Sequence, residues 1–273
     1  MHYFRKVHIL IAITFILLLL ILVNHYKLLA GSETDKQNER LDKFWLRALT
    51  EVYKSPEELQ AQHDRELRKG LLYRKLIKGN PKIKAVALTF DDGPHPAYTM
   101  KLLKVLKKYD VKATFFVVGK MAEKHPELVK EEIKNGYMIG NHTYNHVNLT
   151  NIPDDEIKVE WQACNDVIKA TTGVELAFCR PPGGQYDSKV INAAMDIGLT
   201  TVLWTDDPGD YLKPSDKVLE RKTMEKINPG GIILLHDGIQ QTIDILPQII
   251  ETLKKKGYKF QTVKEMLRDL NRK

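Results

Sequence analysis

From residue 82 to the end of the chain, strand-like and helical patterns alternate, and this alternation leaves few folds open. Seven short runs rich in β-branched and other apolar residues are typical of buried strands, and the segments between them repeat apolar residues at helical spacing. The predicted strands span residues 85–90, 113–118, 137–140, 176–179, 200–204, 231–235 and 258–262. The pattern predicts an α/β fold with a parallel sheet, either a closed barrel or a doubly wound open sheet.

The N-terminal residues predict a membrane anchor. Two basic residues precede an uncharged apolar run over residues 7–23, which as a helix would be about 26 Å long, enough to cross a hydrocarbon core. The alternative is a secretory signal cleaved near Ala30, but the apolar run is long for a signal. We therefore expect a cytoplasmic tail over residues 1–6, a single-pass transmembrane helix, and a catalytic domain outside the membrane, or secreted if the chain is cleaved.

Residues 24–80 are polar and charged, and they predict a helical stalk or linker. Apolar residues from Leu41 to Val52 recur at helical spacing. A second helix start is indicated at Ser55, with proline at the first helical position and Glu58 completing a capping box. No residue in this stretch indicates chemistry.

Composition excludes several classes of protein. The net charge of +7 comes from 42 basic and 35 acidic residues, and the basic excess is scattered over helical patterns without interleaved aromatic residues. We therefore expect a solvated surface and no nucleic-acid partner. The chain contains 2 cysteines and is no disulfide scaffold. Cys164 lies on an apolar helical stripe, as a small buried hydrophobe would, and its pairing with Cys179 is left open. We expect a monomer.

The stretch Thr89-Phe90-Asp91-Asp92-Gly93-Pro94 ends the first predicted strand with two adjacent carboxylates and a turn. Where the strand breaks, both carboxylates can enter one pocket, and two anions so close require a metal ion, an arginine or both. A polar turn is the simpler interpretation of the stretch taken alone. The rest of the chain decides between the two.

Residues that carry chemistry stand at the carboxyl ends of the predicted strands, where parallel α/β folds bind ligands. They are Asp91 and Asp92 after the first strand, His142 and His146 after the third, Arg180 after the fourth, Asp206, Asp207 and Asp210 after the fifth, and His236 and Asp237 after the sixth. Chance would place some of them on helix surfaces or at the opposite strand ends. This placement predicts a site at one end of the sheet.

The residue types indicate a metal-dependent reaction. His142 and His146 face the same way if they occupy one helical turn, and with a carboxylate they form a three-ligand site with open positions. Catalytic zinc and non-haem iron(II) both accept this ligand set. Arg180 near Asp91 would keep a general base ionised, and an acidic partner would make His236 a protonated acid.

Five ordered motifs resemble those of the polysaccharide deacetylases, the family-4 carbohydrate esterases with a NodB-homology domain. They are Thr89-Phe90-Asp91-Asp92-Gly93-Pro94, His142-Thr143-Tyr144-Asn145-His146, Arg180-Pro181-Pro182-Gly183, Asp207-Pro208-Gly209-Asp210-Tyr211 and Leu234-Leu235-His236. The resemblance covers roughly residues 82–267. It implies a distorted (β/α) barrel of about seven parallel strands, with the NodB-type domain over residues 81–273.

The resemblance also implies a role for each residue. Asp92, His142 and His146 would bind the metal, usually zinc, with Co²⁺, Ni²⁺ or Mn²⁺ as alternatives. Asp91 would be the general base oriented by Arg180, and His236 the general acid tuned by Asp210. The Gly183 amide would bind the oxyanion, and Tyr211 and Leu234 would line the acetyl pocket. Gly183 stands where Tyr is frequent, Tyr211 where Trp is frequent and Gly209 where Arg is frequent. These departures concern the choice of substrate and remove no catalytic group.

The implied activity is metal-dependent hydrolysis of acetyl groups on N-acetylglucosamine-type units of an extracytoplasmic polysaccharide, with peptidoglycan as the first choice. Chitooligosaccharides, other poly-N-acetylglucosamine polymers and O-acetylated xylan remain open. A silent glycan-binding protein, a structural membrane protein and an iron oxygenase are alternatives of other classes. The intact acid, base and ligand set favours hydrolysis over all three.

Overall fold

The computed structural model describes residues 52–272 of the chain, and within them strands and helices alternate as predicted. The strands are β1 (Lys75–Leu76), β2 (Ala85–Asp91), β3 (Ala113–Val117), β4 (Met138–Asn141), β5 (Phe178–Cys179), β6 (Thr200–Val202), β7 (Gly231–His236) and β8 (Lys259–Phe260). The pairings between these strands are all parallel. The seven predicted strands are therefore confirmed, and β1 is an addition.

The sheet curves into a distorted barrel. Its strand order is β1-β6-β5-β4-β3-β2-β7, and β8 pairs with the first residues of β2. Beyond the end of β6, Asp206 forms a parallel bridge with Ile233 of β7. Near β1, the Gly79 N–H donates to the Gly230 carbonyl over 2.8 Å, just before β7 begins. These two contacts join the β1–β6 end of the sheet to β7 at its other end. The predicted distorted barrel is therefore confirmed.

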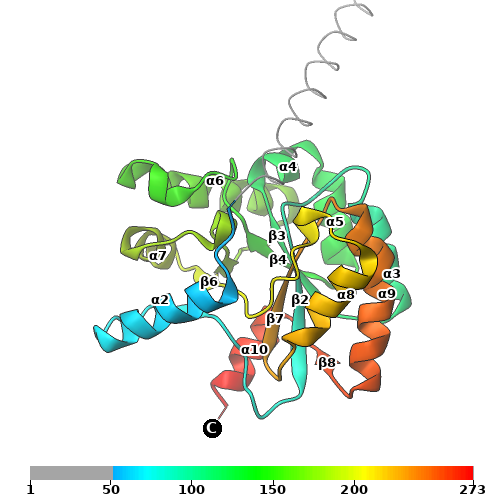
Figure 1. Cartoon of the computed structure of the whole chain (residues 1–273). Helices are drawn as coiled ribbons and strands as arrows, with labels where there is room; N and C mark the ends of the chain where they lie inside the picture. Colours follow the sequence, from blue (N-terminus) through cyan, green and yellow to red (C-terminus); the bar gives the residue numbers. More distant parts are fainter. Residues whose placement is uncertain (1–51, 273) are drawn as a thin grey trace, which may run out of the picture. The chain divides into compact units, whose positions relative to one another are not determined.

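Helices pack around the strands (Figure 1). They are α2 (Pro56–Arg68), α3 (Thr99–Lys108), α4 (Gly119–Lys124), α5 (Pro126–Lys134), α6 (Asp154–Thr172), α7 (Ser188–Asp196), α8 (Asp216–Glu225), α9 (Gln240–Lys255) and α10 (Val263–Leu270). Three 3₁₀ turns, η1 (Leu149–Asn151), η2 (Pro182–Gly184) and η3 (Asp210–Leu212), stand in loops. On α6 the buried residues are Ile157, Trp161, Cys164 and Ile168, the stripe that the helical period predicts.

The core explains why β2 reads as an uninterrupted apolar run. All seven of its residues are buried, as expected for a strand covered on both faces. Phe90 stacks on Phe115 of β3 with ring centroids 5.2 Å apart.

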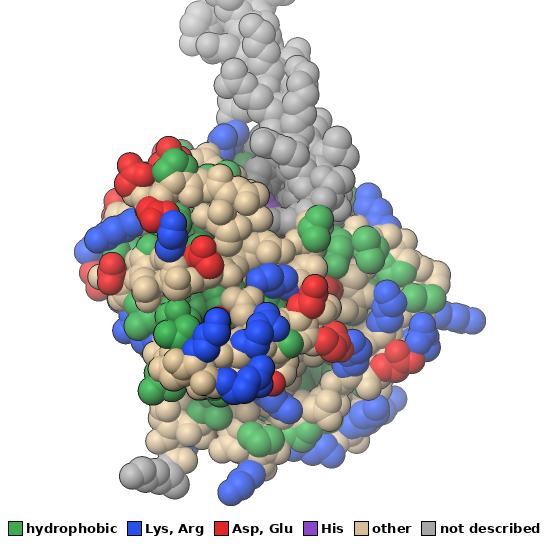
Figure 2. Space-filling model, turned by 60° about the vertical axis from the view of Figure 1, so that its left-hand side comes forward, with side chains coloured by type: hydrophobic (Ala, Val, Ile, Leu, Met, Phe, Trp, Pro, Cys, Tyr) green, Lys and Arg blue, Asp and Glu red, His purple; other side chains and the backbone are tan. Residues whose placement is uncertain are grey.

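Cys164 and Cys179 are free and buried. On the face drawn in Figure 2, Lys and Arg side chains lie among Asp and Glu, as the scattered charge of the sequence indicates.

Part of the predicted stalk belongs to the folded unit. Helix α2 begins with the predicted capping box of Ser55 and Glu58, and its Leu59 is buried. In residues 69–80 the structure differs from a helical stalk, because Lys75–Leu76 pairs with β6. A two-residue strand has no period that a sequence pattern could reveal. The predicted transmembrane run at residues 7–23 lies outside the described residues, and no helix between residues 52 and 272 is long and apolar enough to cross a membrane.

Ser55→Ala should lower the free energy of unfolding by about 1 kcal/mol, because the Glu58 N–H loses the hydroxyl that accepts its hydrogen bond. Ser215, the N-cap of α8, makes no such side-chain bond and provides the matched control Ser215→Ala. Urea unfolding midpoints of both variants measure the difference. Equal losses would show that the α2 cap contributes nothing specific.

Candidate active site

The parallel register brings the predicted site residues together at the carboxyl end of the barrel. Asp91 at the end of β2 is the direct partner of His236 at the end of β7. Asn141 at the end of β4 is the partner of Cys179 in β5, and the Arg180 N–H donates to the Asn141 carbonyl over 2.8 Å. The strand that carries each functional side chain, and the register of that strand in the sheet, therefore determine its position in the site.

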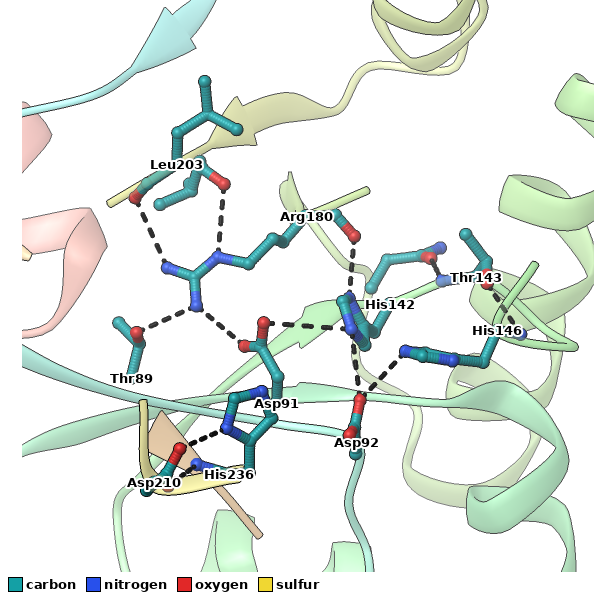
Figure 3. Close-up of polar contacts among 12 residues, drawn as sticks. Thr89, Asp91, Asp92, His142, Thr143, His146, Arg180, Leu203, Asp210 and His236 are labelled. Carbon is teal, nitrogen blue, oxygen red and sulfur yellow. Dashed lines mark hydrogen bonds and ion pairs between the residues drawn. The ribbon is translucent and has the colours of Figure 1, made fainter. Parts of the chain in front are cut away.

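Asp92, His142 and His146 form a cluster suited to a divalent metal ion (Figure 3). Their candidate ligand atoms lie within 4.8 Å of one another, and Asp92 Oδ1 is 3.0 Å from His146 Nε2 and 3.4 Å from His142 Nε2. Asp92 Oδ1 and His142 Nε2 are buried and make no hydrogen bond within the described chain, although buried polar atoms normally have a partner. The donor set and these orphaned atoms fit a bound metal ion.

The orientation of the His142 ring is fixed by a contact of the nitrogen that faces away from the metal cluster. His142 Nδ1 lies 2.8 Å from the Arg180 carbonyl oxygen. Because a carbonyl only accepts hydrogen bonds, Nδ1 carries the proton and the Nε2 lone pair faces the cluster. Burial alone would raise the pKa of Asp92, but the neighbouring His146 holds it well below its ordinary range. The carboxylate is therefore charged and available as a ligand.

The two histidines do not occupy one helical turn, although both face Asp92. Thr143 and His146 have φ of 64° and 56°, so the chain between them is a compact loop. The Asn141 side chain accepts the Thr143 N–H, and the Thr143 hydroxyl accepts the His146 N–H. Glu160 of α6 accepts the backbone N–H of Asn145 over 2.8 Å. Side chains that accept backbone N–H groups thus replace helical bonds and still turn both imidazoles to Asp92.

The adjacent carboxylates point to different partners because the backbone changes conformation between them. Asp91 is the last residue of β2, whereas Asp92 has φ of 74°, a left-handed conformation that aspartate tolerates better than most residues. The next position has room only for glycine, since a Cβ on Gly93 would lie 2.5 Å from Asp237 Oδ2. The turn after β2 therefore separates the two carboxylates.

Asp91 is bound to a buried guanidinium. Arg180 Nη1 lies 2.7 Å from Asp91 Oδ1 and donates to the Thr89 hydroxyl over 2.9 Å. Arg180 is fully buried, and its other nitrogens donate to the carbonyls of Val202 and Leu203. Burial lowers the pKa of Arg180, while the Asp91 carboxylate opposes this shift. Asp91 Oδ2 stays on the metal-cluster side, 3.8 Å from His142 Nε2.

His236 and Asp210 form a second buried pair. His236 Nδ1 lies 2.6 Å from Asp210 Oδ1, and Asp210 Oδ2 accepts the His236 N–H and the Thr242 hydroxyl. Burial alone would lower the pKa of His236, but the Asp210 carboxylate raises it to about 10. The imidazole is therefore protonated at neutral pH, and its buried Nε2 makes no hydrogen bond within residues 52–272.

Three residues predicted to line the site occupy different positions around this pair. The Tyr211 ring lies edge-on to His236, 5.3 Å between centroids, and its hydroxyl donates to Asp207 over 3.1 Å. Leu234 is buried two residues before His236 on β7, hence on the same face. Gly183 has φ of 59° in η2, three residues after Arg180.

Asp206 lies at the predicted strand end but does not join the cluster. Its carboxylate makes no hydrogen bond within the described chain, and burial together with Asp207 raises its pKa to about 8. Other residues of the site were missed. Thr89, Asn141 and Glu160 hold the functional side chains. Thr89 and Asn141 could have been indicated only by their places in or beside the motifs, and Glu160, within α6, has no signal of this kind. Tyr53, whose ring lies 5.2 Å from His236, has no signal in the sequence.

Comparison with known proteins agrees with the site. The sequence model described as polysaccharide deacetylase matches residues 78–202. A peptidoglycan-N-acetylglucosamine deacetylase of Bacillus cereus is 39% identical over 203 residues, which cover 70% of this chain and 91% of that protein. The peptidoglycan-N-acetylmuramic acid deacetylase PdaA of Bacillus subtilis is 33% identical over 199 residues, covering 71% of this chain and 76% of that protein.

A solved structure from Bacillus anthracis, described as a CE4 family pseudoenzyme, has a TM-score of 0.70 and 33% identity, and covers 73% of this chain and 71% of that one. The barrel, the strand-end cluster and these similarities together place the chain among carbohydrate-active hydrolases. It belongs to the polysaccharide deacetylase family, the family-4 carbohydrate esterases, which are hydrolases that act on N-acetyl groups.

The first prediction from the site concerns the Arg180–Asp91 pair. Arg180→Met should lower the free energy of unfolding by about 3–5 kcal/mol, because Asp91 stays buried without its cation. Adding Asp91→Asn removes that charge and should recover a large part of the loss. Urea unfolding of the two single variants and the double variant gives the coupling free energy. Simple additivity would contradict the role assigned to the pair.

The second prediction concerns the His236 imidazole in the metal-free protein. Its folded pKa of about 10 exceeds the ordinary value of 6.5, so its stabilising contribution is complete below pH 6.5 and is lost as pH rises through about 10. Asp210→Asn should lower the pKa of His236 by about 1–3 pH units, since the attractive charge is gone. NMR titration of the ring protons measures it. An unchanged pKa would show that Asp210 is not the group that raises the pKa of His236.

Proposed function

We propose that the protein is a metal-dependent N-deacetylase that acts on N-acetylated sugars of peptidoglycan outside the cytoplasmic membrane. The observation that carries the proposal is that three groups with different chemical roles lie together in one site. A metal-ligand triad, a carboxylate oriented by Arg180 and a protonated imidazole held by Asp210 converge at the carboxyl end of the barrel. Metal-assisted hydrolysis of an amide uses these three functions together.

Zinc is the metal that the donor set fits best, since two imidazoles and one carboxylate leave positions open for water and substrate. Co²⁺, Ni²⁺ and Mn²⁺ can occupy the same ligands. Iron(II) with oxygen would use the triad too, but an oxygenase needs neither the base at Asp91 nor the acid at His236. The pairing of both with buried partners supports hydrolysis.

The chemistry of the chain follows from the protonation states. Asp91, anchored at Oδ1 by Arg180, can accept the proton of the attacking water at Oδ2. A divalent cation bound to the triad supplies polarisation of the acetyl carbonyl and a lower pKa for the water. The Gly183 N–H is the donor proposed for the developing oxyanion. His236 Nε2 donates its proton to the leaving nitrogen, so acetate and a free amine result.

The substrate and the location are inferred from the relatives and the N-terminus. The B. cereus and B. subtilis relatives are named for N-acetylglucosamine and N-acetylmuramic acid of peptidoglycan. A transmembrane helix at residues 7–23 would hold the domain at the outer face of the membrane, next to that polymer. Cleavage near Ala30 would release the same domain.

Acetate release from peptidoglycan and from N-acetylated chitooligosaccharides, with and without a chelator, tests the proposal. Asp91→Asn should keep the metal, measured by elemental analysis, and lose at least ~100-fold in kcat because the base is gone. Asp92→Asn should lose the metal and the activity together. Asp196→Asn, on the exposed surface of α7, is the control. Turnover that survives both chelation and Asp92→Asn would overturn the metal mechanism.

A glycan-binding protein without turnover is the second candidate, because a structural relative is described as a pseudoenzyme. The same assay separates the two, since that protein would bind the glycan and release no acetate. The complete base, acid and ligand set at this site supports the enzyme.

A further inference from the structure

The segment of residues 52–54 runs along the loop that carries Gly183. The Lys54 N–H donates to the Gly183 carbonyl over 2.9 Å, and Gln185 Nε2 donates to the Val52 carbonyl over 3.2 Å. These bonds lie on either side of Tyr53. They fix the Tyr53 backbone against the loop whose amide is proposed to bind the oxyanion.

The Tyr53 ring packs directly on the catalytic residues. It stacks on Tyr211 with centroids 4.3 Å apart and an interplanar angle of 30°. It also lies edge-on to His236, 5.2 Å between centroids at 77°, almost the arrangement of Tyr211 itself at 5.3 Å and 78°. Two stacked aromatic rings from distant parts of the chain thus lie side by side against the imidazole.

Neither Gly183 nor Gly184 of η2 carries a side chain, and a Cβ on Gly184 would lie 2.6 Å from the Trp204 ring. Tyr53 precedes residue 78, where the match to the family model begins. The ring beside the acid therefore comes from a segment that precedes the residues matched by that model, 78–202.

We propose that Tyr53 contacts the substrate and forms, with Tyr211, an aromatic wall against which a pyranose ring of the glycan packs. The inference rests on the proposed function, since the wall stands beside the acid of that reaction. The flat faces of aromatic rings pack on the apolar C–H faces of sugars, while the sugar hydroxyl groups point outward to water or polar groups. Tyr53 thereby favours oligosaccharides over small acetyl esters, which have no ring to pack.

The contacts around the segment favour a fixed wall over a movable cover. Ser55, directly after the segment, caps α2, whose Leu59 is buried in the core. Lys54 Nζ donates to Gln62 Oε1 over 2.6 Å, and Gln62 Nε2 donates to the Tyr186 carbonyl over 3.2 Å. Displacing Tyr53 from the site would break the bonds to Gly183 and Gln185 and strain this anchorage.

The test compares Tyr53→Ala and Tyr53→Phe with the wild-type chain on tetra-N-acetylchitotetraose and on 4-nitrophenyl acetate. In Tyr53→Ala, the ratio of kcat/KM for the oligosaccharide to that for the ester should fall about five- to tenfold, chiefly through KM. Tyr53→Phe keeps the ring and should retain most of the ratio. Tyr109→Ala, at the end of α3, is the matched control that leaves the ratio unchanged.

Three results would overturn the inference. An unchanged ratio means that no sugar packs on Tyr53, a gain of activity on both substrates means that the residue covers the site, and an equal loss on both with a lower Tm means a structural role. If the wild-type chain releases acetate from neither substrate, the proposed function fails instead. Calorimetric binding of the tetrasaccharide to wild type and Tyr53→Ala then still decides the inference, since a wall residue should weaken binding in its absence.

Discussion

The ion pair of Arg180 and Asp91 is the interaction on which the rest of the site depends. A guanidinium with no exposed surface must find partners for its donors, and Arg180 finds them in Asp91, the Thr89 hydroxyl and carbonyls of the β6 end. It therefore links β2, β5 and β6 at one point. A buried ion pair is weak evidence for stability, because hydrophobic residues of similar volume often do as well. Its effect here is to fix the orientation of the Asp91 carboxylate.

The second carboxylate, Asp92, has no arginine partner, and a metal ion is the cation that fits its position. Arg180 is already committed to Asp91, so Asp92 turns away at φ 74° toward His142 and His146. The Arg180 carbonyl meanwhile fixes the tautomer of His142. One residue thus orients the base through its side chain and a metal ligand through its backbone. Two adjacent identical side chains acquire different chemistry because the strand ends between them.

The fold and the reactive residues could be predicted because each has a local signal. Apolar runs reveal strands, and the carboxyl ends of parallel strands lie at one end of the sheet, so Asp91 and His236 were expected in the same site. That they are direct neighbours follows from the pairing of β2 with β7, which no local pattern indicates. The conformation of the 142–146 loop could not be predicted, because it depends on hydrogen bonds to Asn141 and to Glu160 of α6. Strand β1 and Tyr53 were missed for a related reason. Segments of two or three residues have no period, and only tertiary contacts give them a position.

A barrel of this family does not by itself establish catalysis, since one structural relative is described as a pseudoenzyme. Here the metal-ligand triad, the carboxylate bound to Arg180 and the imidazole bound to Asp210 are all present at one end of the barrel. Asp210 raises the pKa of His236, and His146 holds the pKa of Asp92 below its ordinary range. The two groups also favour each other's charged forms, since the Asp92 carboxylate raises the pKa of His236 as well. The site therefore keeps an acid and a carboxylate ligand charged side by side, which is the arrangement that the proposed hydrolysis uses.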